Sequence, residues 1–404
     1  MTNIVDGMTK NISSSNRLNS SSREESDHNL KIDQLSVFLI TNSQELNSLK
    51  NEWQQLFAAS DNLFFQSFEW FVSWWQVYGE SAGYNLSLIT VRHSETKDLL
   101  LLWPLVIKKR GLCRVGMWPC QDLGQYGDIL VDKNLVDKVC FEAAWNEIQK
   151  LKIDLLYLTQ VRKNAKVHPF LRQKMACDSE SEVCCITDFN GFDTWDDYRL
   201  SLSKNFRKRQ GRLLRNFSKS GDLQFEVVTD YSEIRKTIDA ILRLKREWLA
   251  ETGNYGRILE QSEASRWLND IAIQAHEKGN LNLTVLRLNN KIVAGQIAFL
   301  SHNELHANIG AYDIQYRSYG IGRIQTEDAM RWCFDNGYRF FDFMPPYDDY
   351  KNRWSNLSVD VRTFICPLTL SGKIHQVFFS EKFRRKLKYF YRLIPRFVKK
   401  RLVN

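Results

Sequence analysis

Apolar and polar positions alternate along this chain with two periods, and the resulting elements occur in the same order twice. A period of two predicts a strand at 35–40, and a period of about 3.6 predicts a helix at 43–58. The same pair recurs as a strand at 223–228 and a helix at 231–251. Both helices end in related sequences, Leu-Lys-Asn-Glu-Trp53 and Leu-Lys-Arg-Glu-Trp248.

Each half continues with paired strands, a further strand, a helix and a final strand. The paired and final strands are predicted at 86–91, 99–107 and 153–158, and again at 283–288, 291–300 and 338–344. Asn289-Asn290 supplies a tight hairpin turn for the second pair. Equivalent positions lie about 190 residues apart, which indicates a duplicated unit rather than a short solenoid repeat. The sequence therefore predicts an α/β fold of two tandem domains, each a mixed central sheet flanked by helices.

Composition divides the chain into four parts. Residues 1–34 are rich in Ser, Asn and charge, so they are predicted to be a disordered tail. The two domains are predicted at 35–190 and 191–379, with strand-like runs at 359–367 and 374–379 completing the second sheet. No secretory signal pattern begins the chain, and the longest apolar run, 99–107, is about half of a membrane span. We therefore expect a cytoplasmic protein.

The net charge of +9 is concentrated in one segment, 380–404. Ten Lys or Arg residues and one acid follow position 380, so the rest of the chain is neutral, and binding to DNA is not expected. The apolar residues of this segment fall on one face of a helix that Pro395 should kink. Such a basic amphipathic helix suits an anionic membrane surface, although its apolar stripe is equally suited to packing on the protein itself.

Cysteines and histidines show no metal-binding pattern. The eight cysteines include no C-x-x-C pair, and the seven histidines are scattered. We expect reduced cysteines and no metal.

A turn between a predicted strand and a predicted helix carries Arg317-x-x-Gly320-x-Gly322. The two glycines leave the backbone open to a ligand, and the following helix directs its unpaired N–H groups at an anion. The pattern predicts a phosphate seat, which we define by its six residues: Arg317, Ser318, Tyr319, Gly320, Ile321 and Gly322. The alternative is an ordinary glycine-containing helix start.

The order of strands around this turn resembles the GNAT acyltransferases, whose motif of Arg or Gln, two residues, Gly, any residue and Gly or Ala grips the pyrophosphate of acetyl-CoA. Four further sequences look like the CelD-like branch of that superfamily, which is associated with bacterial cellulose and exopolysaccharide biosynthesis. They are Ser203-Lys204-Asn205-Phe206-Arg207, Tyr319-Gly320, Phe341-Asp342-Phe343 and Tyr350-Lys351-x-x-Trp354. The tandem arrangement is shared with the FemAB-type peptidyltransferases.

The resemblance implies two GNAT-like domains, an acetyl-CoA or acyl-CoA donor and an amine acceptor. The first half has no Arg-x-x-Gly-x-Gly, so it resembles a copy without a donor site. By the same resemblance, backbone N–H groups at 309–313 would stabilise the thioester oxygen, and Tyr350, Lys351 and Trp354 would hold the acceptor or close over the donor.

Two residues are candidates for the general base. Strand alternation places Glu304, His306, Asn308 and Tyr312 on one face, and His306 titrates in the required range. Asp342 lies between phenylalanines near the end of a predicted strand, where it is either a catalytic acid or a structural cap. The sequence does not choose between them.

A basic stretch lies between the halves. Residues 204–219 carry seven Lys or Arg residues and no acid, which indicates either a solvated helix face or a contact for an anionic substrate. This stretch leaves open a FemAB-type transferase that uses aminoacyl-tRNA. A non-catalytic scaffold at the inner face of the membrane is the third possibility.

Overall fold

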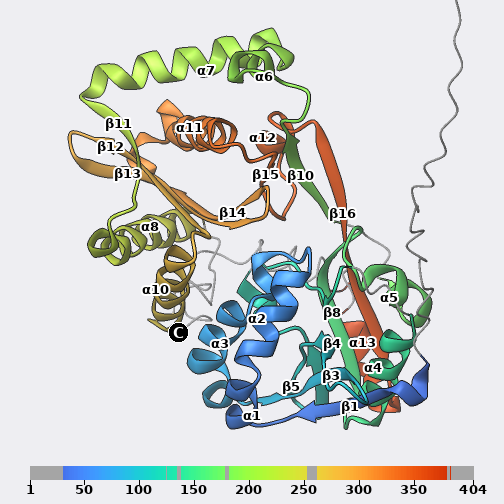
Figure 1. The fold of residues 1–404 in the computed structure, drawn as a ribbon. Coiled ribbons are helices and arrows are strands. Elements are labelled where there is room, and N and C mark those ends of the chain that lie inside the picture. Colours follow the sequence, from blue (N-terminus) through green and yellow to red (C-terminus); the bar gives the residue numbers. More distant parts are fainter. Residues whose placement is uncertain are drawn as a thin grey trace, which may run out of the picture.

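The computed structural model describes residues 31–123, 125–133, 138–177, 182–252 and 262–379, together with Phe383 (Figure 1). The predicted tail 1–34 lies outside the described residues except for its last four, which include the 3-10 helix η1 (Ile32–Gln34). The predicted basic helix 380–404 also lies outside them, apart from Phe383. No helix in the described ranges has both the length and the apolar content needed to cross a bilayer.

The described strands form two sheets. The smaller sheet has the order β1 (Leu35–Ile40), β3 (Leu88–His93), β4 (Leu99–Trp103), β7 (Leu130–Val131), with antiparallel neighbours throughout. The larger sheet begins in the second half with β11 (Leu223–Val227), β12 (Leu281–Leu288), β13 (Lys291–Ser301), β14 (Glu304–Tyr312) and β15 (Phe340–Asp342). It continues through β10 (Glu182–Asp188), β16 (Leu357–Pro367), β8 (Leu155–Arg162), β6 (Cys113–Met117), β5 (Val106–Arg110) and β2 (Tyr84–Leu86), with β9 (Ala176–Cys177) beside β16.

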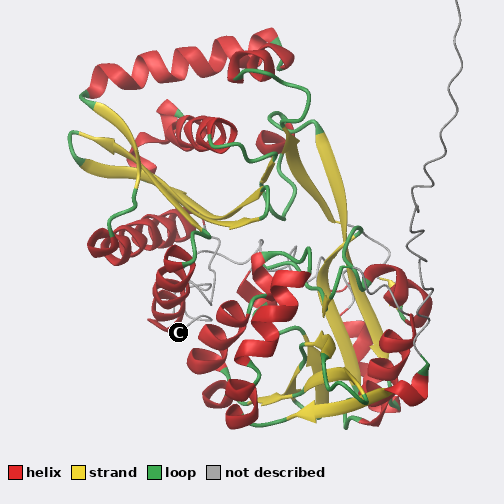
Figure 2. Ribbon diagram, viewed as in Figure 1, coloured by secondary structure: helices red, strands yellow, loops and turns green. Residues whose placement is uncertain are grey.

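Helices cover both faces of the second-half sheet (Figures 1 and 2). On one face α11 (Ile321–Asp335) packs on β13 and β14, and α7 (Lys204–Phe217), preceded by α6 (Trp195–Ser201), packs on α11. On the other face lie α8 (Tyr231–Thr252) and α10 (Ser262–Glu277). The Ser203 hydroxyl accepts a hydrogen bond from the Phe206 N–H and so caps α7, as expected for serine at this position.

The remaining helices belong mainly to the first half. They are α1 (Ser43–Ser48), α2 (Lys50–Ala59), α3 (Phe68–Tyr78), α4 (Lys138–Lys150), α5 (His168–Lys174) and α13 (Leu370–Phe379), while the short α12 (Asp349–Asn352) follows β15.

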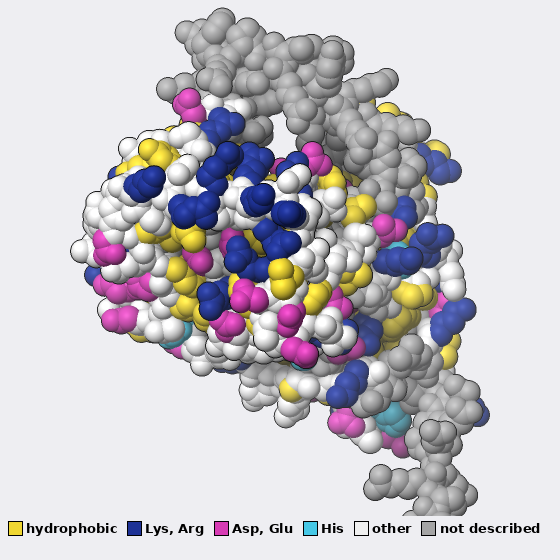
Figure 3. All heavy atoms as spheres, turned by 90° about the horizontal axis from the view of Figure 1, so that it is seen from above, with side chains coloured by type: hydrophobic (Ala, Val, Ile, Leu, Met, Phe, Trp, Pro, Cys, Tyr) yellow, Lys and Arg dark blue, Asp and Glu magenta, His cyan; other side chains and the backbone are white. Residues whose placement is uncertain are grey.

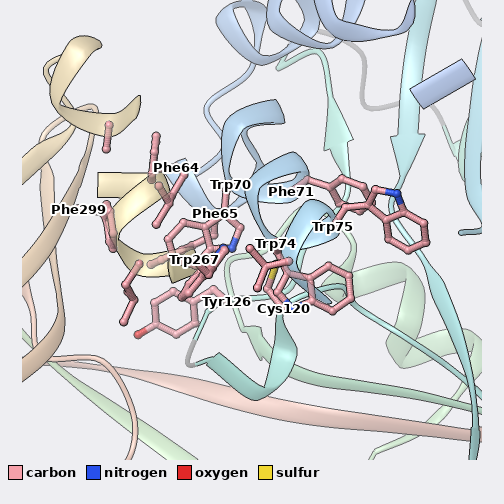
Figure 4. Packing of buried hydrophobic residues seen from close by; sticks show 14 of the residues in the cluster. Phe64, Phe65, Trp70, Phe71, Trp74, Trp75, Cys120, Tyr126, Trp267 and Phe299 are labelled. Carbon is pink, nitrogen blue, oxygen red and sulfur yellow. The ribbon is translucent and has the colours of Figure 1, made fainter. Parts of the chain in front are cut away.

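A shared aromatic core joins the two halves (Figure 4). Trp70 of α3 packs edge-on against Trp267 of α10 at 5.0 Å and against Phe299 of β13 at 5.1 Å between ring centroids. Phe64 stacks on Phe299 at 5.3 Å. Because buried aromatic rings contribute large apolar areas, this contact holds the halves together as one packed body.

The structure confirms the predicted fold class and corrects several elements. The hairpin at Asn289 and Asn290 forms, with φ angles of 49° and 66°. The pairing predicted between 86–91 and 99–107 is confirmed, but each run is divided, since β2 pairs with β5 in the large sheet while β3 pairs with β4 in the small one. The run 374–379 was expected to be a strand but belongs to helix α13.

The boundary predicted at 190 does not separate the packing of the two halves. β10, from the first half, pairs with β15 and β16, and β16 then pairs with β8. β16 has 11 residues, about 36 Å of extended chain, which is long enough to reach from one half to the other. The segment 357–379 therefore packs mostly on the first half, although it was assigned to the second domain.

Candidate functional site

The strands β14 and β15 separate after a short parallel pairing, and we call this place the strand fork. Residues 304–306 pair with 340–342; beyond them β14 runs on to Tyr312, while the other chain turns away through Met344, whose φ is 53°. The fork comprises residues 307–312 on one side and 343–346 on the other. Backbone groups of β14 beyond His306 are therefore not covered by β15.

A bulge in β14 changes the predicted alternation. Ile297 pairs with Ile309 and Phe299 pairs with His306, so one extra residue of β14 stands opposite β13. Ile297 and Phe299 share a face, and His306 and Ile309 consequently share it too. The expectation that these two residues lie on opposite faces is wrong, because the extra residue shifts the alternation by one position.

Four charged or titratable side chains form a buried ion cluster at the closed end of the fork: Arg162, Glu304, His306 and Asp342. The Arg162 Nη1 atom lies 3.0 Å from Glu304 Oε1 and 3.8 Å from Asp342 Oδ2. The His306 Nδ1 atom lies 3.5 Å from Asp342 Oδ2, and both of these side chains are fully buried. His306 also packs against Phe65, which comes from the first half.

Asp342 is the hydrogen-bonding centre of this cluster. Its Oδ1 atom accepts hydrogen bonds from Tyr126 Oη at 3.1 Å, Cys184 Sγ at 2.8 Å and the Met344 backbone N–H at 2.7 Å. Burial by itself would raise the pKa of Asp342, but His306, Arg162 and Cys184 together hold that pKa below its usual range. Asp342 is therefore a carboxylate at neutral pH.

The cluster also contains groups of the kind that bind metals. Ligand atoms of Glu304, His306 and Asp342 lie within 4.8 Å of one another. Arg162 already brings a positive charge to both carboxylates, so a metal ion would be repelled there. The arrangement fits an ion cluster better than a metal site.

Two lysines lie on opposite sides of the fork. Lys351 donates hydrogen bonds to the Met344 carbonyl at 2.8 Å and the Pro346 carbonyl at 2.9 Å. Lys245 of α8 donates to the Gly310 carbonyl at 3.1 Å and lies over the Trp248 ring at 4.8 Å. Burial lowers the pKa of both ammonium groups, and the charge of Lys351 lowers the pKa of Lys245 further.

Two tyrosines complete the fork. The Trp248 indole N–H donates to Tyr312 Oη at 3.2 Å. Burial, with the charge of Asp348, raises the pKa of Tyr350 to about 12, so its phenol keeps its proton at neutral pH.

The predicted phosphate seat forms the beginning of α11. Arg317, Ser318 and Tyr319 are exposed at the end of a 3-10 helix, η6 (Ile314–Tyr319), and Gly320 follows with a φ of 68°. The backbone N–H groups of residues 323 and 324 bond to the Gly320 carbonyl, so those of 321 and 322 lie in the first turn, where no helical carbonyl precedes them. Ile321 is an exception within the seat, since its side chain is buried in the core.

The glycines of the seat also have a packing role. A Cβ atom on Gly320 would lie 2.9 Å from Leu213 of α7, and one on Gly322 would lie 3.0 Å from the Tyr312 ring. These glycines allow α7 and β14 to approach the start of α11 closely. The geometry is thus compatible with a phosphate seat and with the alternative of a closely packed helix start.

Basic side chains gather over the α6–α7 face of the molecule (Figure 3). Hydrophobic residues of α7 pack inward, including Phe206 and Phe217, and its basic residues point mostly outward. Arg323, in the first turn of α11, has its pKa lowered by burial and by the charges of Arg209 and Arg353. Three arginines from different elements are therefore close to one another beside the seat.

The predicted site residues occupy three neighbouring places. His306 and Asp342 lie in the buried ion cluster, Tyr350 and Lys351 lie at the fork, and the seat lies at the start of α11. Sequence reasoning missed the first-half partners Arg162, Tyr126 and Cys184, for which no local pattern gave a signal. It also missed Lys245, although the Leu-Lys-Arg-Glu-Trp248 sequence that contains it had been noticed as a repeat.

Comparisons with known proteins agree with this geometry. The model of the acetyltransferase (GNAT) domain family matches residues 204–352, which is less than half of the chain. No curated protein matches. The matched segment contains α7, the seat, the fork and Lys351.

Solved structures resemble most of the chain at low sequence identity. FemX is 12% identical with a TM-score of 0.54, covering 80% of this chain and 97% of its own. L-PGS from Bacillus licheniformis is 12% identical with a TM-score of 0.52, covering 83% and 96%. The C-terminal domain of a putative lysylphosphatidylglycerol synthetase from Agrobacterium fabrum is 11% identical with a TM-score of 0.50, covering 79% and 92%. The chain thus shares its fold with these proteins over most of its length, and residues 204–352 are similar to the GNAT acetyltransferase domain.

Proposed function

We propose that this protein is an N-acyltransferase that moves an acyl group from acyl-CoA to an amine. The observation that carries this proposal is the strand fork, which lies beside the first turn of α11 within the segment that matches the GNAT domain. A fork supplies uncovered backbone groups for a thioester, and the helix start supplies N–H groups for phosphates.

The seat would hold the donor. The N–H groups of Ile321 and Gly322, together with the exposed Arg317, suit the CoA pyrophosphate. The acyl group would then enter the fork, where those N–H groups of residues 309–312 that face away from β13 can stabilise the oxygen of the tetrahedral intermediate, whereas the Asp313 N–H already donates to the Val293 carbonyl at 2.7 Å.

Lys351 and Tyr350 are the side chains best placed for proton transfer. When the acceptor nitrogen attacks the thioester, a C–N bond forms, the C–S bond breaks and the amine loses a proton. Lys351, whose pKa is lowered, is suited to receive that proton in its neutral form. Tyr350, which remains protonated, is suited to donate to the departing thiolate. His306 and Asp342 are fully buried and would act from behind the fork.

The test begins with donor binding, measured by thermal shift and calorimetry with acetyl-CoA, longer acyl-CoAs and free CoA. A ligand at 100 times its Kd should raise the stability of the folded protein by about 2.7 kcal/mol. Arg317→Ala should weaken binding, whereas Arg331→Ala, at an exposed position late in α11 and away from the seat, should not. Lys351→Met should reduce the chemical step and leave CoA binding intact. Absence of any shift in the wild-type protein would overturn the proposal.

A second candidate uses the basic face of α7. Its outward-facing Lys and Arg residues suit the phosphates of an aminoacyl-tRNA donor in a FemAB-type reaction. Salt-sensitive tRNA binding without CoA binding would favour this candidate. A non-catalytic scaffold would show neither turnover nor donor binding.

We place the proposed reaction in bacterial cell-envelope or exopolysaccharide biosynthesis, as in the CelD-like branch, and at the inner face of the membrane. Support for a membrane surface comes from α13, whose Leu370, Ile374, Val377 and Phe378 are exposed just before the basic segment 380–404. Flotation with anionic vesicles should depend on this segment. Equal flotation after removal of 380–404 would exclude it as the anchor.

A further inference from the structure

A pocket of about 530 Å³ opens between the start of α7 and the chain that follows α12. Its volume lies in the range of small-molecule sites, roughly 300–1,000 Å³. It is distinct from the fork, since none of its lining residues belongs to β14 or to the chain between β15 and α12.

Two arginines and no acid line this pocket. Arg209 comes from α7, and Arg353 follows the last residue of α12. Arg323 adds a third charge nearby, since its pKa is lowered by burial and by the charges of these two residues. Among the residues that the structure describes, none of the three forms an ion pair within 4.0 Å with a carboxylate. Three like charges repel one another, and a bound anion would relieve that repulsion.

The lining also includes three aromatic residues, Tyr198, Phe206 and Trp354, which we call the aromatic wall and which contact one another. Phe206 packs edge-on against Trp354 with ring centroids 4.7 Å apart. Tyr198 Oη donates to the Trp354 carbonyl at 2.6 Å. The Trp354 side chain is 1% exposed, and its indole N–H has no hydrogen-bond partner in the described part of the chain. A pocket lined by both arginines and aromatic rings suits a phosphorylated nucleoside.

The pocket also lies where the seat ends. Arg323 directly follows Gly322, and its charge interacts with both pocket arginines. A CoA molecule carries two separate anionic groups, the pyrophosphate and the ribose 3′-phosphate, and the base lies next to the second. A donor whose pyrophosphate occupies the seat can therefore place its other end in this pocket.

We propose that this pocket binds the 3′-phosphorylated adenosine end of the donor, with Arg209 and Arg353 on the 3′-phosphate and the aromatic wall against the nucleoside. This inference rests on the proposed acyl-CoA donor. It assigns a role to Arg209, Arg353 and Trp354 that the glycine motif does not include.

The experiment compares CoA with dephospho-CoA, which lacks only the 3′-phosphate. By calorimetry, the wild-type protein should bind CoA about tenfold more tightly, in line with one charge-assisted contact of modest strength. Arg209→Ala and Arg353→Ala should weaken CoA binding alone, so that the ratio of the two dissociation constants, dephospho-CoA to CoA, falls towards one. Arg212→Ala, also on the exposed part of α7 but outside the pocket, serves as the matched control. Adenosine 3′,5′-bisphosphate should compete with CoA in the wild-type protein and not in the two pocket variants.

Each outcome is decisive. If CoA binds but dephospho-CoA binds equally well, or if the pocket variants weaken both ligands alike, the inference fails while the acyl-CoA proposal stands. If neither ligand binds the wild-type protein, the pocket inference and the acyl-CoA proposal both fail. Trp354→Leu gives a second measurement, because loss of the aromatic wall should weaken adenosine 3′,5′-bisphosphate binding even where the ratio is retained.

Discussion

Replacing Arg162 with methionine should destabilise the protein more than replacing any exposed arginine. Arg162 is 7% exposed and supplies the positive charge for Glu304 and Asp342. Methionine keeps much of the apolar volume but removes the charge, so two carboxylates remain in a buried place. Asp342 retains its hydrogen bonds from Tyr126, Cys184 and the Met344 N–H, whereas Glu304 has no comparable set.

Breaking a buried ion pair from one side costs about 3–5 kcal/mol of unfolding free energy. We expect about 3 kcal/mol here, since Asp342 keeps part of its stabilisation. The matched control is Arg92→Met, which breaks a pair whose partner, Glu52, is 41% exposed and can be solvated. That change should cost about 1 kcal/mol or less. Glu304→Gln added to Arg162→Met should restore about 1–2 kcal/mol, because it removes one unpaired charge.

Urea unfolding of the wild-type protein and the three variants, followed by fluorescence, would measure these differences as shifts in midpoint at a constant m value. The loss in Arg162→Met should also be smaller at pH 5 than at pH 8. Its buried carboxylates would have pKa values above those of the unfolded chain, so protonation favours the folded state and stability falls as the pH rises. Equal losses at Arg162 and Arg92, or a loss independent of pH, would refute the reasoning.

Two further predictions concern α11. Burial and the charge of Glu327 raise the pKa of Asp328 to about 7, against the opposing charge of Arg331. This pKa lies well above that of the unfolded chain, so the contribution of Asp328 to stability is complete below pH 4 and is lost as the pH rises through about 7. Thermal melts should therefore show that the melting temperature of Asp328→Asn rises relative to that of the wild-type protein between pH 5 and 8. A difference in melting temperature that stays constant over this pH range would contradict the prediction. Gly320→Val should lower the free energy of unfolding in urea by roughly 2 kcal/mol, because a β-branched residue is strained at a φ of 68° and its Cβ atom would press on Leu213. A variant as stable as the wild-type protein would show that glycine is not required at this position.

The sequence pattern correctly predicted elements that are determined by residues close together in the chain. The helix at 231–251 and the hairpin at Asn289 and Asn290 follow from a helical period and from turn residues that tolerate positive φ. The run 86–91 could not be divided in advance, because its apolar residues continue from Leu86, the last residue of β2, into β3, although the two strands join different sheets. The period of apolar residues indicates which face of a strand is buried, but it does not indicate with which other strand that strand pairs.

The sequence could name candidate positions for the site but not the surroundings of their side chains. The seat, His306, Asp342, Tyr350 and Lys351 could be named because they follow motifs or strand alternation. Their burial could not: the bulge in β14 changes the face on which His306 lies relative to the residues after it, and Asp342 is buried by side chains distant in the sequence. Arg162 was equally hidden, since it lies about 180 residues from Asp342 along the chain. Its strand, β8, is connected to the second-half strands through β16 and β10.

The contacts of Asp342 argue for a positioning role in the proposed reaction. Its Oδ1 atom binds the Met344 N–H at 2.7 Å, and the Met344 carbonyl in turn binds Lys351 Nζ at 2.8 Å. Asp342 thus fixes the turn that presents Lys351 to the fork. Its side chain has no exposed surface, and hydrogen bonds from both halves already hold it as an anion. The first half, which carries no glycine motif, therefore contributes to the site by supplying the buried groups that keep this turn in place.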